Sequence, residues 1–166
     1  LDEGEMYLND KKVNMSSIKN VIASGISLVP RNRKEKGIIK DLSIQDNLSI
    51  AFFKNMHKKL FINKNEETER YNKNKELINI KADNPSDLIT SLSGGNQQKV
   101  IISRWLANNP DVLIMDEPTR GIDVGAKAEI YKLILELAKQ GKTIIVVSSE
   151  MPEILGITNR IGVMSN

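Results

Sequence analysis

The feature that most constrains this chain is a short apolar run that ends in two acids. The run, Val112-Leu113-Ile114-Met115, is followed directly by Asp116 and Glu117. Four apolar residues are too few for a helix, and Pro110 precedes them, so the run predicts a strand that is buried on both faces. Because such a strand needs helices on both sides of a parallel sheet, we expect an α/β fold.

The residues after the two acids continue this alternation of strands and helices. The expected elements are a helix over 124–140, a buried strand over 143–147, a short helix over 152–156 and a strand over 160–164. Asp123 is the expected N-cap of the long helix and Gly141 its stop, and the apolar residues of this helix share one stripe. This order predicts a parallel core with right-handed crossovers between its strands.

The residues before the apolar run differ in composition between two segments. The first 40 residues predict a hairpin of Glu5–Leu8 with Lys11–Val13, a helix that ends near Gly25, and a buried strand over Ile26–Val29. Residues 54–75 hold seven Lys or Arg against three Glu. This charged stretch is most simply a solvated, helix-rich excursion. The alternative is a nucleic-acid patch, against which the scarcity of stacking aromatic side chains counts.

Composition excludes several classes of site. The chain has no Cys, so disulfides, thiolate zinc sites and cysteine nucleophiles are ruled out. Its 24 basic and 21 acidic residues give a net charge of +3, far from the dense positive charge of a dedicated nucleic-acid binder. No apolar stretch approaches the length of about 18 residues that indicates a membrane-spanning helix. Bulk composition therefore indicates no partner.

The two acids are candidates for chemistry, because ligands of a parallel sheet bind beyond the carboxyl ends of its strands. Side chains alternate along a strand, so Asp116 and Glu117 are expected to face different ways. One carboxylate can then hold a hard cation such as Mg²⁺ while the other orients or deprotonates a water. The alternative is that both acids are N-caps at the start of a loop.

A second candidate motif is Leu92–Lys99, which leads into a predicted helix. Gly94 and Gly95 expose backbone N–H groups at the helix start, and Ser93 adds a hydroxyl. The positive end of the helix can therefore receive a phosphate. Taken alone, the same Ser-Gly-Gly sequence is also compatible with an ordinary helix cap.

In this order and wording, the two motifs resemble those of ATP-binding cassette (ABC) ATPases. Leu92–Lys99 is similar to the family's signature motif, Val112–Pro118 to its Walker B strand, and Arg120–Asp123 to its D-loop. Residues 96–99, 118–127 and 148–156 more narrowly resemble the second cassette of the duplicated ATPases that power bacterial monosaccharide importers of the ribose, galactose and xylose type. The resemblance extends over nearly the whole chain.

The resemblance implies a P-loop NTPase-like parallel sheet core, incomplete here, with a helical subdomain and a short antiparallel β segment. It divides the chain into an N-terminal β-rich piece with the Q-loop region (1–40), a helical subdomain with the signature motif (41–110) and a parallel α/β core (111–166). The core would carry the Walker B, D-loop and H-loop positions.

The resemblance also implies ATP and Mg²⁺ as cofactors and assigns roles to residues. Asp116 would hold Mg²⁺ and Glu117 would act on the attacking water, with Ser149 as a third catalytic position. The nucleotide-contacting residues would be Ser93, Gly94, Gly95, Gln97 and Asp123. Of these, Ser93, Gly94 and Gly95 would contact the γ-phosphate of a nucleotide held mainly by a companion cassette.

The implied partners are transmembrane sugar permease subunits, the companion cassette and, indirectly, a periplasmic or lipoprotein sugar-binding protein, with no nucleic acid. The implied location is the cytoplasmic face of the bacterial membrane, peripherally bound. The alternative is a cassette ATPase that acts on nucleic acid in repair or translation, but the coiled-coil insertions or different D-loop wording typical of such proteins are not visible. Choice of sugar belongs to the permease and the binding protein.

Three departures from the family pattern qualify these expectations. No G-x-x-x-x-G-K-[ST] phosphate loop is present, so we expect a fragment that binds ATP weakly at best and does not hydrolyse it alone. Ser149 occupies the position of the switch histidine, and a hydroxyl cannot present an imidazole proton. Arg31 replaces the Q-loop Gln or Glu and cannot ligate Mg²⁺, so it would pair either with phosphate or with an acid of a membrane subunit.

Overall fold

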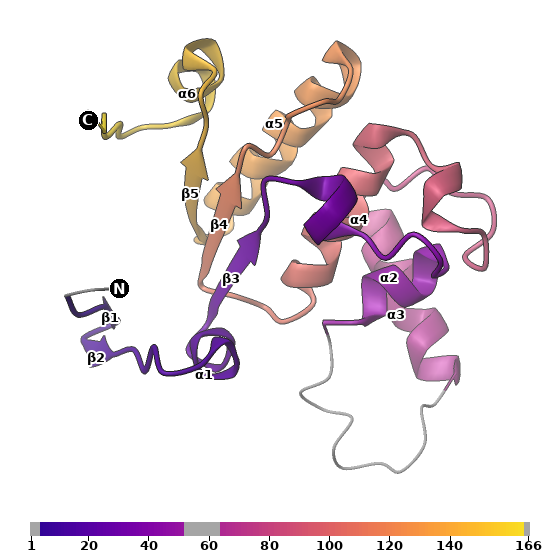
Figure 1. Cartoon of the computed structure of the whole chain (residues 1–166), viewed down its shortest axis with the longest axis horizontal. Coiled ribbons are helices and arrows are strands. Elements are labelled where there is room, and N and C mark those ends of the chain that lie inside the picture. The colour runs from indigo at the N-terminus through magenta and orange to yellow at the C-terminus, as the bar shows by residue number, and fades with distance from the viewer. Residues whose placement is uncertain (1–3, 52–63, 165–166) are drawn as a thin grey trace.

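A computed structural model describes residues 4–51 and 64–164 of the chain. Its centre is a parallel sheet of three strands in the order β3-β4-β5, namely β3 (Ile26–Val29), β4 (Val112–Asp116) and β5 (Thr143–Val147) (Figure 1). Val112 is paired with Ile26 on one side and with Thr143 on the other. The α/β class and the bounds predicted for β3 and β5 are confirmed.

Burial differs between the two faces of the sheet. In β4, Leu113 and Met115 are fully buried, whereas Ile114 is half-buried. Leu28 of β3 is 48% exposed, and Ile145 and Val147 of β5 are exposed, although the sequence predicts that both strands are buried. The prediction is wrong for both strands because Leu28, Ile114 and Ile145 lie side by side on one face of the sheet, and no helix of the described residues covers that face.

Helix α5 (Val124–Lys139) forms as its sequence predicts. Asp123 is the N-cap, and its carboxylate accepts the backbone N–H of Ala126 at 2.9 Å. The stripe that faces the sheet consists of Ile130, Leu133, Ile134 and Leu137, all buried. Gly141 ends the helix with a φ of +87°, a conformation that glycine adopts without the steric cost of a side chain.

The strand predicted over residues 160–164 does not form. After helix α6 (Met151–Ile157) the chain continues without regular structure, and Met164 is 98% exposed. A strand is stable only where a neighbour completes its hydrogen bonds. Within the described residues no strand pairs with 160–164, so the apolar pattern of this segment alone does not make it a strand.

A short hairpin lies near the amino ends of the sheet strands (Figure 1). Strands β1 (Tyr7–Leu8) and β2 (Lys11–Lys12) pair antiparallel, and Asn9 and Asp10 connect them with φ angles of +51° and +61°. Two positive φ angles are typical of the tight turns that join such strands. Helix α1 (Ile18–Ala23) follows, with Ser17 as N-cap, and packs beside β3. The predicted hairpin and helix are confirmed.

Most of the remaining helices gather on the β3 side of the sheet (Figure 1). They are α2 (Ile44–Ser49), α3 (Lys64–Ile78) and α4 (Gly94–Leu106), with a π-helical turn η1 (Arg33–Gly37) and a short 3-10 turn η3 (Ile89–Ser91). Part of the basic stretch forms α3, as the helix-rich interpretation predicts, and residues 54–63 of it lie outside the described residues. No helix of the described chain has the length and apolar character needed to cross a bilayer.

A buried polar network joins η1, α2 and α4. The Asn47 amide donates to the carbonyls of Ile39, Leu42 and Ser43, and its oxygen accepts the Ile39 N–H at 2.8 Å. Arg104 of α4 donates to the Asn47 side chain at 3.0 Å and to the Gly37 carbonyl at 2.6 Å. Burial lowers the pKa of the Arg104 guanidinium to about 10. The network holds the segment that follows β3 against the helices.

We predict that Asn47→Ala destabilises the protein by about 3 kcal/mol or more, because it leaves buried groups of Arg104 and Ile39 without partners. Urea unfolding of the purified protein measures the loss. Asn72→Ala on the exposed face of α3 is the matched control and should stay within about 0.5 kcal/mol of the unmodified protein. Equal stability of both variants would contradict the structural role of the network.

Candidate functional site

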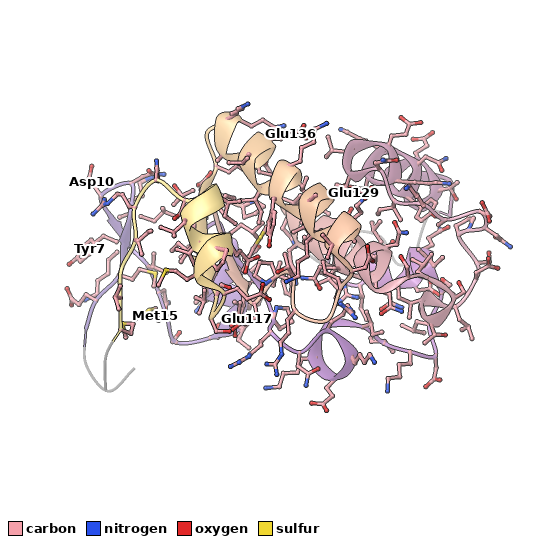
Figure 2. The ribbon with its side chains drawn as sticks, turned by 90° about the horizontal axis from the view of Figure 1, so that it is seen from above. Tyr7, Asp10, Met15, Glu117, Glu129 and Glu136 are labelled. Carbon is pink, nitrogen blue, oxygen red and sulfur yellow. The ribbon has the colours of Figure 1, made fainter. Side chains whose placement is uncertain are left out.

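The carboxyl ends of the three parallel strands bring together residues that are far apart in the sequence. Arg31 follows β3, Glu117 follows β4 and Ser149 follows β5; Figure 2 looks onto this end of the sheet and labels Glu117. The backbone N–H of Ser149 donates to Glu117 Oε1 at 3.1 Å. Arg31 Nη2 lies 3.7 Å from the same oxygen. The segments that follow three neighbouring strands therefore meet at one carboxylate.

The backbone places Glu117 in an uncommon conformation. Its φ is +49°, in the left-handed region that side-chain-bearing residues rarely adopt. Its N–H donates to the Val147 carbonyl at 2.7 Å, which holds the residue against the end of β5. The side chain is only 8% exposed. A buried carboxylate on strained backbone is typical of a functional site rather than of an acidic cap on a loop.

Asp116 ends β4 beside Val147 and is half-buried. Within the described residues no side chain or N–H forms a hydrogen bond or ion pair with its carboxylate, and no group of three His, Cys, Asp or Glu is arranged to hold a metal. Mg²⁺ is commonly held by one or two carboxylates, with water and substrate phosphates as its other ligands. Asp116 fits that donor set as a single protein ligand.

Glu153 of α6 is a buried acid that the sequence reasoning missed. Its carboxylate accepts the Thr119 hydroxyl at 2.9 Å and also the Ser148 hydroxyl. These hydroxyls belong to the segments that follow β4 and β5. Glu153 therefore ties both segments to α6. The signal was the placement of hydroxyl residues after two strands, but only the tertiary structure shows which acid they contact.

The Ser93 turn forms a second group of candidate residues, at the start of α4. Ser93 is the N-cap, and its hydroxyl oxygen accepts the Asn96 N–H at 3.4 Å and the Asn96 amide at 3.2 Å. Gln97 turns inward and donates its amide to the Leu92 carbonyl at 2.9 Å. The residues Leu92–Gln97 thus hold their own turn together, with Ser93 exposed.

Close packing holds the start of α4 against the start of α5. A Cβ on Gly95 would lie 2.4 Å from Cβ of Ala126, so only glycine fits there. Asp123, the N-cap of α5, belongs to the same first turn of the helix as Ala126. Of the residues predicted for the site, Asp116, Glu117 and Ser149 form one group, and Ser93, Gly94, Gly95, Gln97 and Asp123 form the other. Within the described chain no hydrogen bond joins Ser93 or Gln97 to Asp116 or Glu117.

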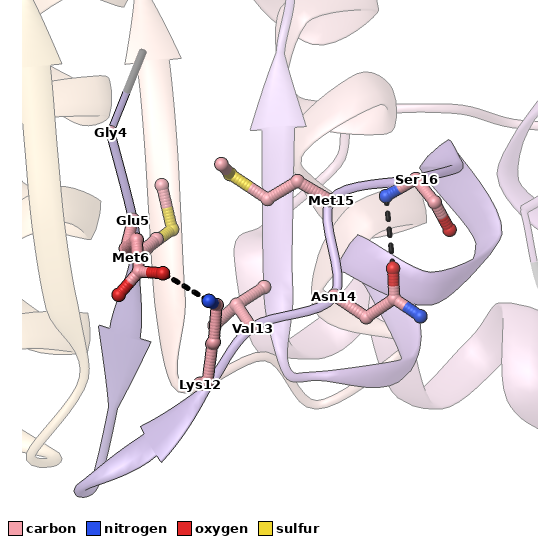
Figure 3. A pocket seen from close by; sticks show the side chains of 8 residues that line it. All are labelled: Gly4, Glu5, Met6, Lys12, Val13, Asn14, Met15 and Ser16. Carbon is pink, nitrogen blue, oxygen red and sulfur yellow. Dashed lines mark hydrogen bonds and ion pairs between the residues drawn. The ribbon is translucent and has the colours of Figure 1, made fainter.

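A hollow of about 440 Å³ lies elsewhere, at the hairpin (Figure 3). It is lined by Gly4, Glu5, Met6, Lys12, Val13, Asn14, Met15 and Ser16. Its two charged side chains, Glu5 and Lys12, form an ion pair with each other. Because the hairpin is near the amino ends of the strands, the hollow is separate from both groups of candidate residues (Figure 1).

Comparison with protein families agrees with this geometry. The family model described as "ABC transporter" matches residues 1–120, which is well over half of the chain. The chain belongs to the ABC transporter family. The matched residues include the Ser93 turn, β4 and Glu117, so the resemblance inferred from the motifs is confirmed.

Individual relatives within the ABC family are similar over almost the whole chain. A galactose/methyl galactoside import ATP-binding protein of Treponema pallidum is 51% identical over 164 residues, which is 99% of this chain and 33% of the relative. A ribose import ATP-binding protein of Halalkalibacterium halodurans is 45% identical over 98% of this chain and 33% of the relative. The chain spans about a third of the length of these curated relatives.

Solved ABC cassettes share the fold. A nucleotide-free ATP-binding cassette from an ABC transporter matches with a TM-score of 0.78 and 25% identity, over 94% of this chain and 63% of that structure. A dimeric cassette in a post-hydrolysis state bound to ADP and phosphate matches with a TM-score of 0.72 and 26% identity, over 91% of this chain and 65% of that structure. The predicted P-loop NTPase-like α/β fold is therefore confirmed.

We predict that Gly95→Ala destabilises the protein by about 1–3 kcal/mol, because the added methyl group overlaps Ala126. Ala126→Gly alone should cost about 1 kcal/mol through helix propensity. In the double variant the overlap is absent, so the combined loss should be smaller than the sum of the single losses by about 1 kcal/mol or more. Additive losses in urea unfolding would contradict the close contact of α4 with α5.

Proposed function

We propose that this chain forms part of an ATP-hydrolysing cassette that powers the import of a monosaccharide. The observation that carries the proposal is the buried Glu117 carboxylate, which segments after all three parallel strands position at the end of β4. The import ATP-binding proteins that share 45–51% identity with the chain support the substrate class. Which sugar is carried is a property of partner proteins.

The reaction in this proposal is in-line transfer of the terminal phosphoryl group of ATP to water. Mg²⁺, when bound, would neutralise negative charge that develops on the phosphate group. Asp116 would hold this ion, since its carboxylate lies at the strand end without a protein partner among the described residues. Glu117 would orient the attacking water and accept its proton as the new O–P bond forms.

The Ser93 turn would act on a second nucleotide, held mainly by a companion cassette. Ser93 and the first N–H groups of α4 offer donors and the positive end of the helix dipole to a γ-phosphate. Gln97 and Asp123 would support this contact by holding the Ser93 turn and the start of α5. Each ATP would then lie between two cassettes, so that neither has a complete site alone.

Two residues of the Glu117 site depart from the family pattern. Arg31 lies beside Glu117 and is 54% exposed, so its positive charge sits at the edge of the site where the family has a Gln or Glu. From the sequence, Arg31 is expected to pair with phosphate or with an acid of a membrane subunit. In the folded chain its partner is Glu117, which is neither of these. Ser149 contacts Glu117 through its backbone N–H, and its side chain offers a hydroxyl in place of an imidazole.

The proposed partners are the companion cassette, transmembrane permease subunits at the cytoplasmic face of the membrane and, indirectly, an extracytoplasmic sugar-binding protein. The division into residues 1–40, 41–110 and 111–166 stays a prediction, in which the helices between η1 and α4 face the permease. The chain taken alone should not hydrolyse ATP, because a phosphate loop supplies most of the nucleotide affinity in this class of protein.

We predict that Glu117→Gln in the complete gene product lowers ATP hydrolysis about 100-fold or more while ATP still binds, because the amide cannot accept the proton of water. Phosphate release measures hydrolysis, and uptake of labelled sugar into vesicles measures transport. Glu136→Gln, an exposed acid on α5 (Figure 2), is the matched control and should leave both unchanged. Unchanged hydrolysis and transport in Glu117→Gln would overturn the role of Glu117.

A further inference from the structure

Arg33 is a buried cation whose surroundings in the folded chain leave it poorly partnered. It begins η1, directly after the segment that carries Arg31, and is only 9% exposed. Its Nη2 donates to the Gly121 carbonyl at 3.4 Å, a long hydrogen bond, and its Nε has no partner among the described residues. No carboxylate of the described chain lies within ion-pair distance of it.

Arg104 shows that an arginine can be buried in this fold with a full set of hydrogen-bond acceptors. Arg104 is equally buried, but it donates to the Gly37 carbonyl, the Asn47 carbonyl and the Asn47 side chain. Arg104 has the acceptors that a structural arginine needs. Burial lowers the pKa of Arg33 as well, because removal from water disfavours its charged form.

Arg33 also lies directly against the start of α4. A Cβ on Gly94 would be 3.0 Å from Arg33 Nη2 and 3.4 Å from its Cζ, so the guanidinium fills the space that a side chain would occupy. Gly94 is the first residue of this 13-residue helix, whose first N–H groups lack partners within the helix. A buried cation and the positive end of a helix are therefore adjacent, and an anion would relieve both.

We propose that Arg33 binds the terminal phosphate of the nucleotide that the Ser93 turn contacts. This inference rests on the proposed function and adds a residue to it. The guanidinium presents donors in a planar fork that matches two phosphate oxygens, and the hydrogen bond to Gly121 sets its orientation. A side chain at Gly94 would crowd the guanidinium and push it slightly out of this position.

The experiment measures the affinity of the complete gene product, with its transport partners, for ATP and for ADP. ATP is supplied as a non-hydrolysable analogue, because Glu117 does not act on the nucleotide at the Ser93 turn, and Mg²⁺ is present throughout. A residue that contacts only the terminal phosphate affects ATP and not ADP. We expect Arg33→Met to lower the preference for ATP over ADP by about tenfold or more, as for loss of a charged hydrogen bond. Arg33→Lys should retain part of the preference.

Lys36→Met is the matched control, since it removes an exposed positive charge from the same turn, and its preference should equal that of the parent protein. An unchanged preference in Arg33→Met, or an equal loss of ATP and ADP affinity, would show that Arg33 only supports the fold. If Arg33→Met does not fold, Arg33→Lys decides: a preference equal to that of the parent overturns the proposal, and a partial loss confined to ATP supports it.

Failure of the proposed function gives a different result. If the parent protein itself does not bind ATP, or binds ATP and ADP equally, the nucleotide chemistry assigned to the chain is wrong and the inference about Arg33 fails with it. If the parent prefers ATP and Arg33→Met keeps that preference, the proposed function stands and only the role of Arg33 is overturned.

Discussion

The parallel pairing of β3, β4 and β5 is the constraint on which the rest of the structure depends. Pairing of Val29 with Met115, and of Asp116 with Val147, brings the ends of three strands into line. Because parallel strands end on one edge, the segments that follow them meet there. Glu117 receives a hydrogen bond from the segment after β5 and faces a cation from the segment after β3. A shift of one residue in either pairing would separate these groups.

Around this edge, the loop between β4 and α5 connects the two groups of candidate residues. Glu117 begins the loop at the sheet, Gly121 accepts a hydrogen bond from Arg33, and Asp123 starts α5 beside the Ser93 turn. The segment after β3 touches the loop twice, through Arg31 and through Arg33. Its far end is held by Gly37 and Arg104 against the helices. Movement of the helices relative to the sheet would therefore shift the contacts that the segment after β3 makes with this loop.

The sequence pattern predicts correctly those features that depend only on neighbouring residues. The bounds of β3 and β5, the turn at Asn9 and Asp10, and the capping of α5 by Asp123 follow from apolar runs and from residues with known backbone preferences. The strand expected over 160–164 failed because pairing depends on a neighbour that the pattern does not describe. The exposed face of β5 could not be predicted for the same reason, since burial depends on which helix covers it.

The candidate site divides in the same way. Motif spacing identified Glu117 and the Ser93 turn, but the contacts of Arg31, Arg33 and Glu153 join segments separated by tens of residues and appear only in the fold. The most direct test is a structure of the complete gene product with its partners, bound to a non-hydrolysable ATP analogue and Mg²⁺. The account predicts one γ-phosphate within hydrogen-bond distance of Ser93 and the N–H groups that begin α4, with a companion cassette holding that ATP. ATP bound away from α4, with Ser93 still facing solvent, would contradict it.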